Sequence, residues 1–421
     1  MEVQMNANDR RMLRELAKHV DEIATHPVME ERRNAWKRHN CLNRERPLVL
    51  VFPEGAWREL LPPNHLLCED ETARGIEAEL RIRLYQHAHF LDDKPVERIW
   101  HVSKIVNGSG TDWGVALDWG LQPQHHESSQ ATGAWGFNPV LKSRDDIRKL
   151  RIPRVVYDEA ATQSKLEQVC DLFGDILDIR LSGVRHVSFH FSSLYIHLRG
   201  LEPMLMDMMD EPDMVHEAMA FFEQGYQEVT RQLATQNLLS LNNDASYHSS
   251  GGVGYTDELP AEGFDATHVR PCDIWASAES QEMAPVSPAM HDEFLMQYER
   301  RVLEPFGLNG YGCCEDLTHK LDRVMQFPNM RRISISPWAQ VEPCAEALGG
   351  QFIFSWKPHP SHLVGDFDEV IIRREVRQAL TAAHRNGCVL ELILKDTHTC
   401  QNHPERFTEW TRIAREEIER L

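Results

Sequence analysis

The sequence predicts an α/β protein and, within that class, a (β/α)8 barrel of the TIM type. Three observations predict it: short apolar stretches typical of strands recur along the chain, most of them precede a stretch with helical periodicity, and there are eight such strands. Strands that alternate with helices form a parallel sheet, and eight such units close into a barrel. The alternative is an open doubly wound sheet, but no Gly-x-Gly-x-x-Gly follows a strand and no Walker-type lysine loop occurs.

The N-terminal segment is expected to form an amphipathic helix over residues 8–24. Leu13, Leu16, Val20 and Ile23 are spaced by three, four and three residues, which places them on one helix face. We expect residues 1–45 to form a helical extension whose apolar face covers the barrel or a partner subunit. The second arrangement would give a homodimer.

The barrel itself is expected to span residues 46–421. Its eight predicted strands are 48–52, 185–191, 238–242, 272–277, 307–313, 332–336, 351–356 and 389–395. The predicted helices are 70–92, 213–234, 288–303, 318–326, 368–383 and a last one from Pro404. Residues 93–184 are longer than a simple crossover, so we interpret them as an insertion with some β structure that forms a lid or an interface element.

Composition and charge exclude several classes of protein. Lys and Arg number 45 and Asp and Glu number 65, so the net charge is −20, which argues against nucleic acid or an anionic membrane as the main partner. No apolar run approaches the about 20 residues of a membrane span. The N-terminus is charged and unlike a signal peptide, and nine cysteines are too few for a disulfide scaffold, so we expect a cytoplasmic protein with free thiols.

Polar or metal-binding residues follow most of the predicted strands. In a barrel the active site lies at the carboxyl ends of the strands, so these residues are the candidates for it. We predict Glu282 and Glu315 as catalytic residues. The predicted substrate-binding residues are Asn243, Asp244, Gln281, Lys357 and His359.

Two of the strand ends carry soft metal ligands, at Cys313 and Cys314 and at His398 and Cys400. Thiolate and imidazole are typical zinc ligands, and a catalytic zinc takes three protein ligands with one position open. We therefore predict zinc bound by Cys313, His398 and Cys400, with Cys314 as a possible ligand. The alternative is that these cysteines are small buried apolar residues.

The chain resembles the uroporphyrinogen decarboxylase-like superfamily, which is built on a (β/α)8 barrel, and the most specific parts of the resemblance lie in the second half. The resemblance covers about residues 45–420. The segments that carry it are SAESQEMAPVSPAMHDEF, LNGYGCCEDLTHKLD, RRISISPWAQVE, FIFSWKPHPSHL, LELILKDTHTCQNHPERF and LRGLEPMLMDMMDEPDMVHE.

The resemblance implies one of two chemistries: decarboxylation without a metal, or zinc-dependent methyl transfer to or from a corrinoid protein. True decarboxylases carry a motif resembling R-x-P-x-W-x-M-R-Q-A-G-R, of which only Arg46-Pro47 and Trp57-Arg58 remain here. The methyltransferase branch places His-x-Cys at one strand end. Cys313 matches its cysteine, whereas Tyr311 occupies the histidine position. The resemblance is therefore closer to the methyltransferase branch.

The resulting hypothesis is a zinc-dependent methyltransferase that demethylates a small methylated substrate and passes the methyl group to a corrinoid carried by a partner protein. Zinc would polarise the heteroatom that bears the methyl group, and Glu282 or Glu315 would protonate or orient the leaving group. A second hypothesis is a decarboxylase that anchors a small carboxylate with Lys357, Arg58 or His359. A different metal-dependent lyase or hydrolase, and a barrel that only binds a partner, are two further hypotheses.

Overall fold

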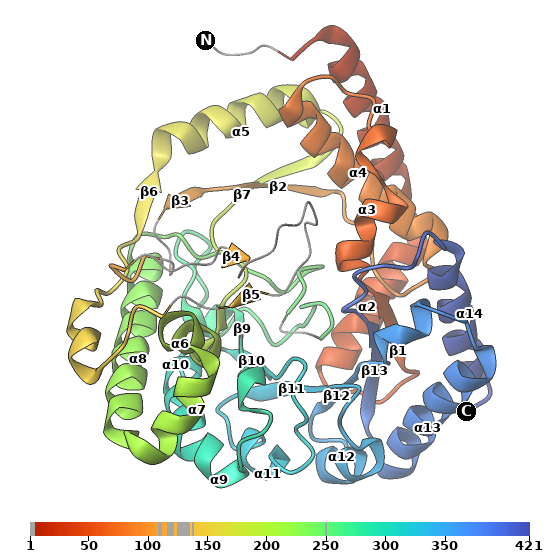
Figure 1. The fold of residues 1–421 in the computed structure, drawn as a ribbon. Helices are drawn as coiled ribbons and strands as arrows, with labels where there is room; N and C mark the ends of the chain where they lie inside the picture. Colours follow the sequence, from red (N-terminus) through yellow and green to blue (C-terminus); the bar gives the residue numbers. More distant parts are fainter. Residues whose placement is uncertain (1–4, 108–111, 116–121, 124–134, 137–138, 249–250) are drawn as a thin grey trace.

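The computed structural model describes residues 5–107, 112–115, 122–123, 135–136, 139–248 and 251–421. Its centre is a sheet of seven strands, all parallel to their neighbours, with helices around it (Figure 1). The strands follow the order β1 (Leu48–Val51), β13 (Val389–Leu394), β12 (Ile353–Trp356), β11 (Met330–Ile335), β10 (Leu308–Tyr311), β9 (Trp275–Ala278) and β8 (Ser188–Phe189). The prediction of an α/β protein with a parallel sheet is confirmed.

The register of the sheet brings the carboxyl ends of distant segments to one edge. Val51 pairs with Leu394, and Ile335 pairs with Trp356. The residues that follow these strands therefore meet at the same edge, although up to about 340 residues of sequence separate them. This edge is where the site is expected.

One of the eight predicted strands, 238–242, does not join this sheet as a strand. Leu239 forms a single isolated bridge with Val184. At the opposite side of the sheet, the free edge of β1 is covered by a loop: Asp93 donates its N–H to the Val49 carbonyl at 2.8 Å, and the Asp93 carboxylate accepts the Val49 N–H at 2.8 Å. Among the described residues the sheet is thus TIM-like but is not closed by strand pairing. At the edge of β1, Asp93 binds the backbone N–H and carbonyl that a neighbouring strand would otherwise pair with.

The segment after Asn242 packs on the inner face of the sheet. Val253 and Tyr255 form a buried cluster with Leu48, Leu50 and Ile393, which point inward from β1 and β13. The residues that alternate with them on these strands belong to the large core beneath the helices. Successive side chains of a strand point to opposite faces of the sheet. One set therefore packs in the outer core and the other set packs against this inner loop.

Helices cover the outer face of the sheet. They are α6 (Phe191–Arg199), α7 (Leu201–Asp210), α8 (Pro212–Thr235), α9 (Pro288–His291), α10 (Gln297–Leu303), α11 (Leu321–Val324), α12 (Val341–Leu348), α13 (Glu369–Asn386) and α14 (Glu405–Glu419). A π-helical turn, Asp292–Met296, joins α9 to α10, so the predicted helix 288–303 is continuous. The predicted helix 318–326 is reduced to the single turn α11.

A second layer lies at the top of Figure 1, away from the seven-stranded sheet. It contains α1 (Ala7–Ala24), α4 (Glu71–His89) and α5 (Glu159–Phe173), together with β2 (Ile99–Ser103) paired in parallel with β7 (Asp178–Ser182). Residues of α1, α4 and α5 share one buried apolar cluster. The apolar face of α1 is therefore covered within the chain, by the layer that the insertion helps to build.

The remaining elements of the N-terminal half are short, apart from α2 (Pro27–Asn40). Within the predicted insertion, β3 (Ile105–Asn107) pairs with β6 (Val156–Asp158), and β4 (Gln122–Pro123) pairs with β5 (Trp135–Gly136). The short helix α3 (Trp57–Leu60) follows β1. Part of the insertion lies outside the described residues.

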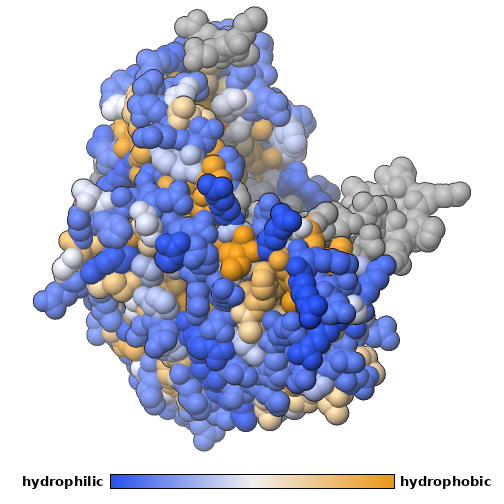
Figure 2. Space-filling model, turned by 90° about the vertical axis from the view of Figure 1, so that its left-hand side faces the viewer, coloured by the Kyte–Doolittle hydropathy of each residue, from blue (hydrophilic) through white to orange (hydrophobic). Residues whose placement is uncertain are grey.

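The surface is mostly hydrophilic. Figure 2 shows one face on which blue residues predominate and apolar residues reach the surface near the middle. No described helix is long and apolar enough to cross a membrane. All nine cysteines are free in this structure.

Candidate active site

Two adjacent thiols lie at the carboxyl end of β10. The chain turns at Gly312, whose φ of +95° favours glycine, and a Cβ there would lie 2.9 Å from Cδ1 of Leu317. After this turn the Sγ atoms of Cys313 and Cys314 are 3.5 Å apart. Both residues lie beyond the strand end, so the alternation of a strand does not separate their side chains.

Glu315 supports this turn from below. It is 1% exposed, and its carboxylate accepts the N–H of Cys313 at 2.8 Å and that of Ser280 at 3.5 Å. Burial, reinforced by the charge of Glu279, raises the pKa of this carboxyl group. These contacts make Glu315 a residue that positions the cysteine turn, and its predicted catalytic role stays a prediction.

Charged groups from β13 and from the turn after β1 surround the thiols. The Lys395 ammonium is 3.9 Å from Sγ of Cys313, 3.0 Å from Oδ1 of Asp396 and 3.8 Å from Oε1 of Glu54. Cys314 donates its S–H to Oδ2 of Asp396 at 3.7 Å. Burial opposes the charge on Lys395, but the Cys313 thiol and the two carboxylates together raise its pKa. The thiol pair therefore lies between a permanent cation and two carboxylates.

The two thiols do not ionise independently. The hydrogen bond between Cys313 and Cys314 raises the pKa of Cys313 and lowers the pKa of Cys314. The two thiols consequently lose their protons in two separate steps. The thiolate that forms first accepts a hydrogen bond from the S–H of the thiol that is still protonated. Such an arrangement favours a nucleophilic thiolate at one of the two positions.

A carboxylate and a histidine adjoin the pair on the opposite side. Glu279, after β9, accepts a hydrogen bond from the Cys313 thiol and forms an ion pair with Nδ1 of His190 at 3.0 Å. Burial opposes ionisation of Glu279, but its bond to His190 leaves its pKa below the usual value. His190 follows β8, so five strand ends contribute to this edge of the site.

Tyr247 reaches the site from the inner loop. Its hydroxyl is buried and has no hydrogen-bond partner among the described residues. Burial, and then the charges of Cys313, Glu54 and Asp396, raise its pKa well above the usual value. Tyr247 is therefore a neutral phenol whose buried O–H has no partner among the described residues.

Lys357 lies at the end of β12 and is 1% exposed. Its ammonium donates to the Ser334 hydroxyl and, at 3.4 Å, to the Ser355 carbonyl. Burial, together with repulsion from Lys395, lowers its pKa to about 7. Of the predicted substrate-binding residues, this is the one that the structure brings close to Cys313 and Lys395.

The remaining predicted substrate-binding residues have separate surroundings. His359 accepts the Ser361 N–H at 3.2 Å with Nδ1, and Gln281 is exposed. Asn243 donates to the Leu259 carbonyl at 2.8 Å. Asp244 lies in a pocket between β2 and the inner loop. The carboxylate of Glu282, the second predicted catalytic residue, accepts a hydrogen bond from the Ser192 hydroxyl at the start of α6.

The predicted zinc ligands do not converge. The Cys400 thiol is buried and donates to Oε2 of Glu59 at 3.1 Å, because Glu59 collects the donors of the 399–402 turn. His398 is exposed and packs against Gly55. In the part of the chain that the structure describes, no group of three or more His, Cys, Asp or Glu side chains is arranged to hold a metal ion. The predicted three-ligand zinc site thus does not fit this structure.

The sequence missed Tyr247 and Glu54 as residues of the site. Glu54 follows the first predicted strand, so the rule that selected the neighbouring strand ends could have found it. Tyr247 also follows a predicted strand, 238–242, but the course of its loop is set by contacts with distant strands, so the sequence does not show where its side chain lies. Tyr311, at the position of the family's histidine, donates to Oε2 of Glu299 in α10 at 2.9 Å, away from the thiols.

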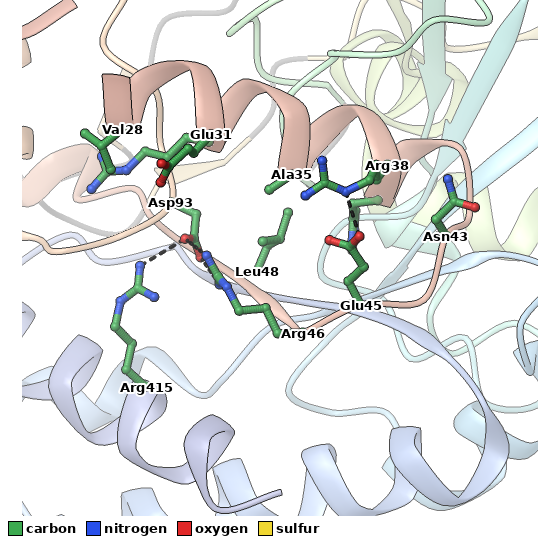
Figure 3. A pocket seen from close by; sticks show the side chains of 12 residues that line it. Val28, Glu31, Ala35, Arg38, Asn43, Glu45, Arg46, Leu48, Asp93 and Arg415 are labelled. Carbon is green, nitrogen blue, oxygen red and sulfur yellow. Dashed lines mark hydrogen bonds and ion pairs between the residues drawn. The ribbon is translucent and has the colours of Figure 1, made fainter. Parts of the chain in front are cut away.

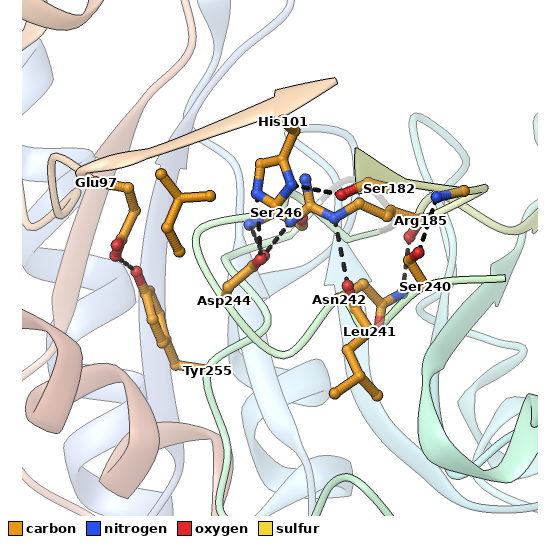
Figure 4. A network of polar contacts seen from close by, with 12 residues as sticks. Glu97, His101, Ser182, Arg185, Ser240, Leu241, Asn242, Asp244, Ser246 and Tyr255 are labelled. Atoms are coloured by element: carbon orange, nitrogen blue, oxygen red, sulfur yellow. Dashed lines mark hydrogen bonds and ion pairs between the residues drawn. The ribbon is translucent and has the colours of Figure 1, made fainter. Parts of the chain in front are cut away.

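Two cavities have linings that do not include the thiols. One, of about 380 Å³, is lined by residues of β2 and by Asp244, and its polar network is shown in Figure 4. The other, of about 490 Å³, lies between α2 and α14 near the amino end of β1 (Figure 3). In the second cavity Arg46, before β1, and Arg415, on α14, both bind Asp93, so these ion pairs hold α14 and the segment before β1 to the loop that covers the edge of the sheet.

Comparisons with known proteins do not assign the chain to a family. No protein-family model matches it, and no curated protein does. Among solved structures, one similar chain is a methyltransferase from Methanosarcina mazei, with a TM-score of 0.37 and 10% sequence identity; the match covers 63% of this chain and 72% of that chain. A similarity this low carries no argument about function, which must rest on the site.

Proposed function

We propose that this protein is a methyltransferase that removes a methyl group from a small methylated compound and passes it to a corrinoid carried by a partner protein. The resemblance of its second half to the uroporphyrinogen decarboxylase-like superfamily supports the reaction class. The observation that carries the proposal is the pair of thiols beside Lys395 at the carboxyl edge of the sheet; the resemblance gave Cys313 the position of a zinc-binding cysteine, and we propose a nucleophilic role for the pair instead.

The chain's own contribution is a thiolate nucleophile. In the proposed step the thiolate of the Cys313–Cys314 pair attacks the methyl carbon, and an S–CH3 bond forms as the bond from carbon to the donor's heteroatom breaks. The electron pair stays on the heteroatom, which takes a proton from a neighbouring acid. No oxidant or reductant is needed in this step.

Neighbouring groups would assist the leaving heteroatom. The O–H of Tyr247 is unsatisfied and can donate to it, and the Lys395 ammonium stabilises negative charge as it develops. Glu315 holds the turn that presents the two thiols. The corrinoid would supply the final acceptor of the methyl group, whereas zinc is assigned no role in this step, because the predicted ligands do not assemble.

Decarboxylation has less support from the geometry. Of the three anchors that the sequence offered for a carboxylate, only Lys357 lies beside the thiols. Arg58 donates to the His398 carbonyl at 3.2 Å on the surface, and His359 caps its own helix.

The test is a methyl-transfer assay with free, reduced cobalamin as the acceptor. Trimethylamine, dimethyl sulfide and an aryl methyl ether would be offered in turn, and methylcobalamin would be followed by absorbance. We expect the wild type to transfer from one of these classes, and Cys313→Ser and Cys314→Ser to lose at least about a hundredfold of the rate. Cys388→Ser, which alters a distant buried thiol, is the control. Undiminished transfer by both site variants would refute the proposal.

A further inference from the structure

The two thiols at the carboxyl end of β10 are held close together by the backbone of their turn. Glu315 accepts the N–H of Cys313 at 2.8 Å, and the Ser334 hydroxyl donates to the Cys313 carbonyl at 3.0 Å. With the backbone fixed in this way, the Sγ atoms of Cys313 and Cys314 lie 3.5 Å apart. A disulfide bond is about 2.0 Å long, so the two sulfurs need to approach each other by only about 1.5 Å.

The pair also differs from other cysteines of the chain in its surroundings. Cys313 and Cys314 are partly exposed, whereas four other cysteines, among them Cys388 and Cys400, are buried. The Lys395 ammonium lies 3.9 Å from Sγ of Cys313. A neighbouring cation favours the thiolate, which is the form of cysteine that peroxides oxidise. The site therefore offers an oxidant an accessible sulfur with a second sulfur beside it.

We propose that Cys313 and Cys314 are a site of reversible oxidation, at which a hydroperoxide converts the two thiols into a disulfide. One thiolate attacks the peroxide, so that an S–O bond forms while the O–O bond breaks, and the released alkoxide takes the proton that this thiol gave up. The second sulfur then attacks the first: the S–S bond forms, the S–O bond breaks, and the hydroxyl group leaves as water with the proton of the second thiol. Two electrons pass from the sulfurs to the peroxide, and the products are a disulfide, an alcohol and water.

A disulfide between neighbours in the sequence is readily reduced. Adjacent Cα atoms lie about 3.8 Å apart, whereas the usual range for disulfides begins at about 4.4 Å. Such a bond is strained, and strained disulfides are the labile ones, so a dithiol should reverse the modification. The effect on activity rests on the proposed function: while the disulfide holds both sulfurs, neither can attack a methyl carbon.

The test follows the mass of one peptide and does not depend on methyl transfer. The reduced protein would be treated with tert-butyl hydroperoxide, the remaining thiols would be blocked with iodoacetamide, and the tryptic peptide 302–320 would be measured by mass spectrometry. We expect this peptide to lose two hydrogens and dithiothreitol to restore them. The reaction should be at least about tenfold faster than loss of the free thiol of Cys170, which is exposed.

Three controls separate the folded site from mere adjacency in the sequence. In urea the two cysteines remain neighbours but lose Lys395 and the hydrogen bonds of the turn, so the disulfide should form at least about tenfold more slowly. In the folded protein, Lys395→Met should slow the reaction severalfold, and Lys104→Met, which removes a cation beside Tyr157, should leave the rate unchanged. Cys314→Ser should form no disulfide in the peptide 302–320. Circular dichroism checks that each variant is folded.

A peptide 302–320 that keeps its hydrogens, or gains two oxygens as a sulfinic acid instead, would overturn the inference. Equal rates in urea and in the folded protein, or in Lys395→Met and wild type, would do the same. If the disulfide forms as expected but wild type transfers no methyl group, the proposed function fails and the oxidation site stands. If methyl transfer is found and the pair resists the hydroperoxide, the oxidation site fails and the proposed function stands.

Discussion

Replacement of Glu391 by glutamine should expose how strongly the inside of the sheet depends on one buried ion pair. Glu391 on β13 is fully buried, its Oε1 accepts from Nε of Arg332 on β11 at 3.0 Å, and its Oε2 lies 3.1 Å from Nε2 of His39. Arg332 is itself 1% exposed and also donates to the Val253 carbonyl of the inner loop. The variant would leave this guanidinium buried without its counter-charge.

The expected loss of folding free energy can be worked out in two ways, from the pKa shift of Glu391 and from the cost of breaking a buried ion pair. Burial opposes ionisation of Glu391, but Arg332 and His39 lower its pKa from 4.5 to about 2, and this shift corresponds to about 3 kcal/mol of folding free energy. Removing one partner of a buried pair costs about 3–5 kcal/mol in other proteins. We therefore expect Glu391→Gln to lower the free energy of unfolding by about 3 kcal/mol at pH 7.

The assay is urea denaturation followed by tryptophan fluorescence, repeated at several values of pH. Because the folded-state pKa of Glu391 lies below its unfolded value, its stabilising effect is complete above pH 4.5 and is lost as the pH falls toward 2. The difference in the free energy of unfolding between wild type and variant should become smaller as the pH falls from 4.5 toward 2. Glu409→Gln, which breaks an exposed pair with Arg412, should cost less than about 1 kcal/mol. A loss in Glu391→Gln no larger than in this control would refute the reasoning.

Three further outcomes are expected. Iodoacetamide should label the Cys313–Cys314 pair much faster than the buried Cys388, as read by peptide mass spectrometry, and equal rates would remove the argument for an activated thiolate. Gly251→Ala should lower stability by about 1–3 kcal/mol in thermal unfolding, because its Cβ would lie 2.0 Å from Cδ of Arg332; an unchanged melting temperature would show that the inner loop does not pack as described. Elemental analysis should find less than one zinc per chain, since the predicted ligands do not assemble, and a full equivalent lost in both Cys313→Ala and His398→Ala would contradict the geometry.

The order of strands and helices along the chain could be predicted from local sequence. Apolar runs such as Leu48–Val51 and Val389–Leu394 became neighbouring parallel strands, because their composition makes them strands whatever their surroundings. The parallel sheet then indicated where function is expected, and this rule selected the thiols after β10, whereas Lys395, which approaches Cys313, was assigned to the last strand itself.

Which of these candidates meet depends on packing between distant segments. Cys400 and Cys313 look alike in the sequence, but Glu59 on α3 binds the Cys400 thiol, while the turn at Gly312 directs Cys313 and Cys314 toward Lys395. The edge of β1 likewise has the composition of a paired strand, yet the Asp93 carboxylate occupies it. Such outcomes depend on distances between residues far apart in the chain, and local periodicity contains no information about them. Only the packed structure therefore leaves the Tyr247 hydroxyl buried without a hydrogen-bond partner among the described residues.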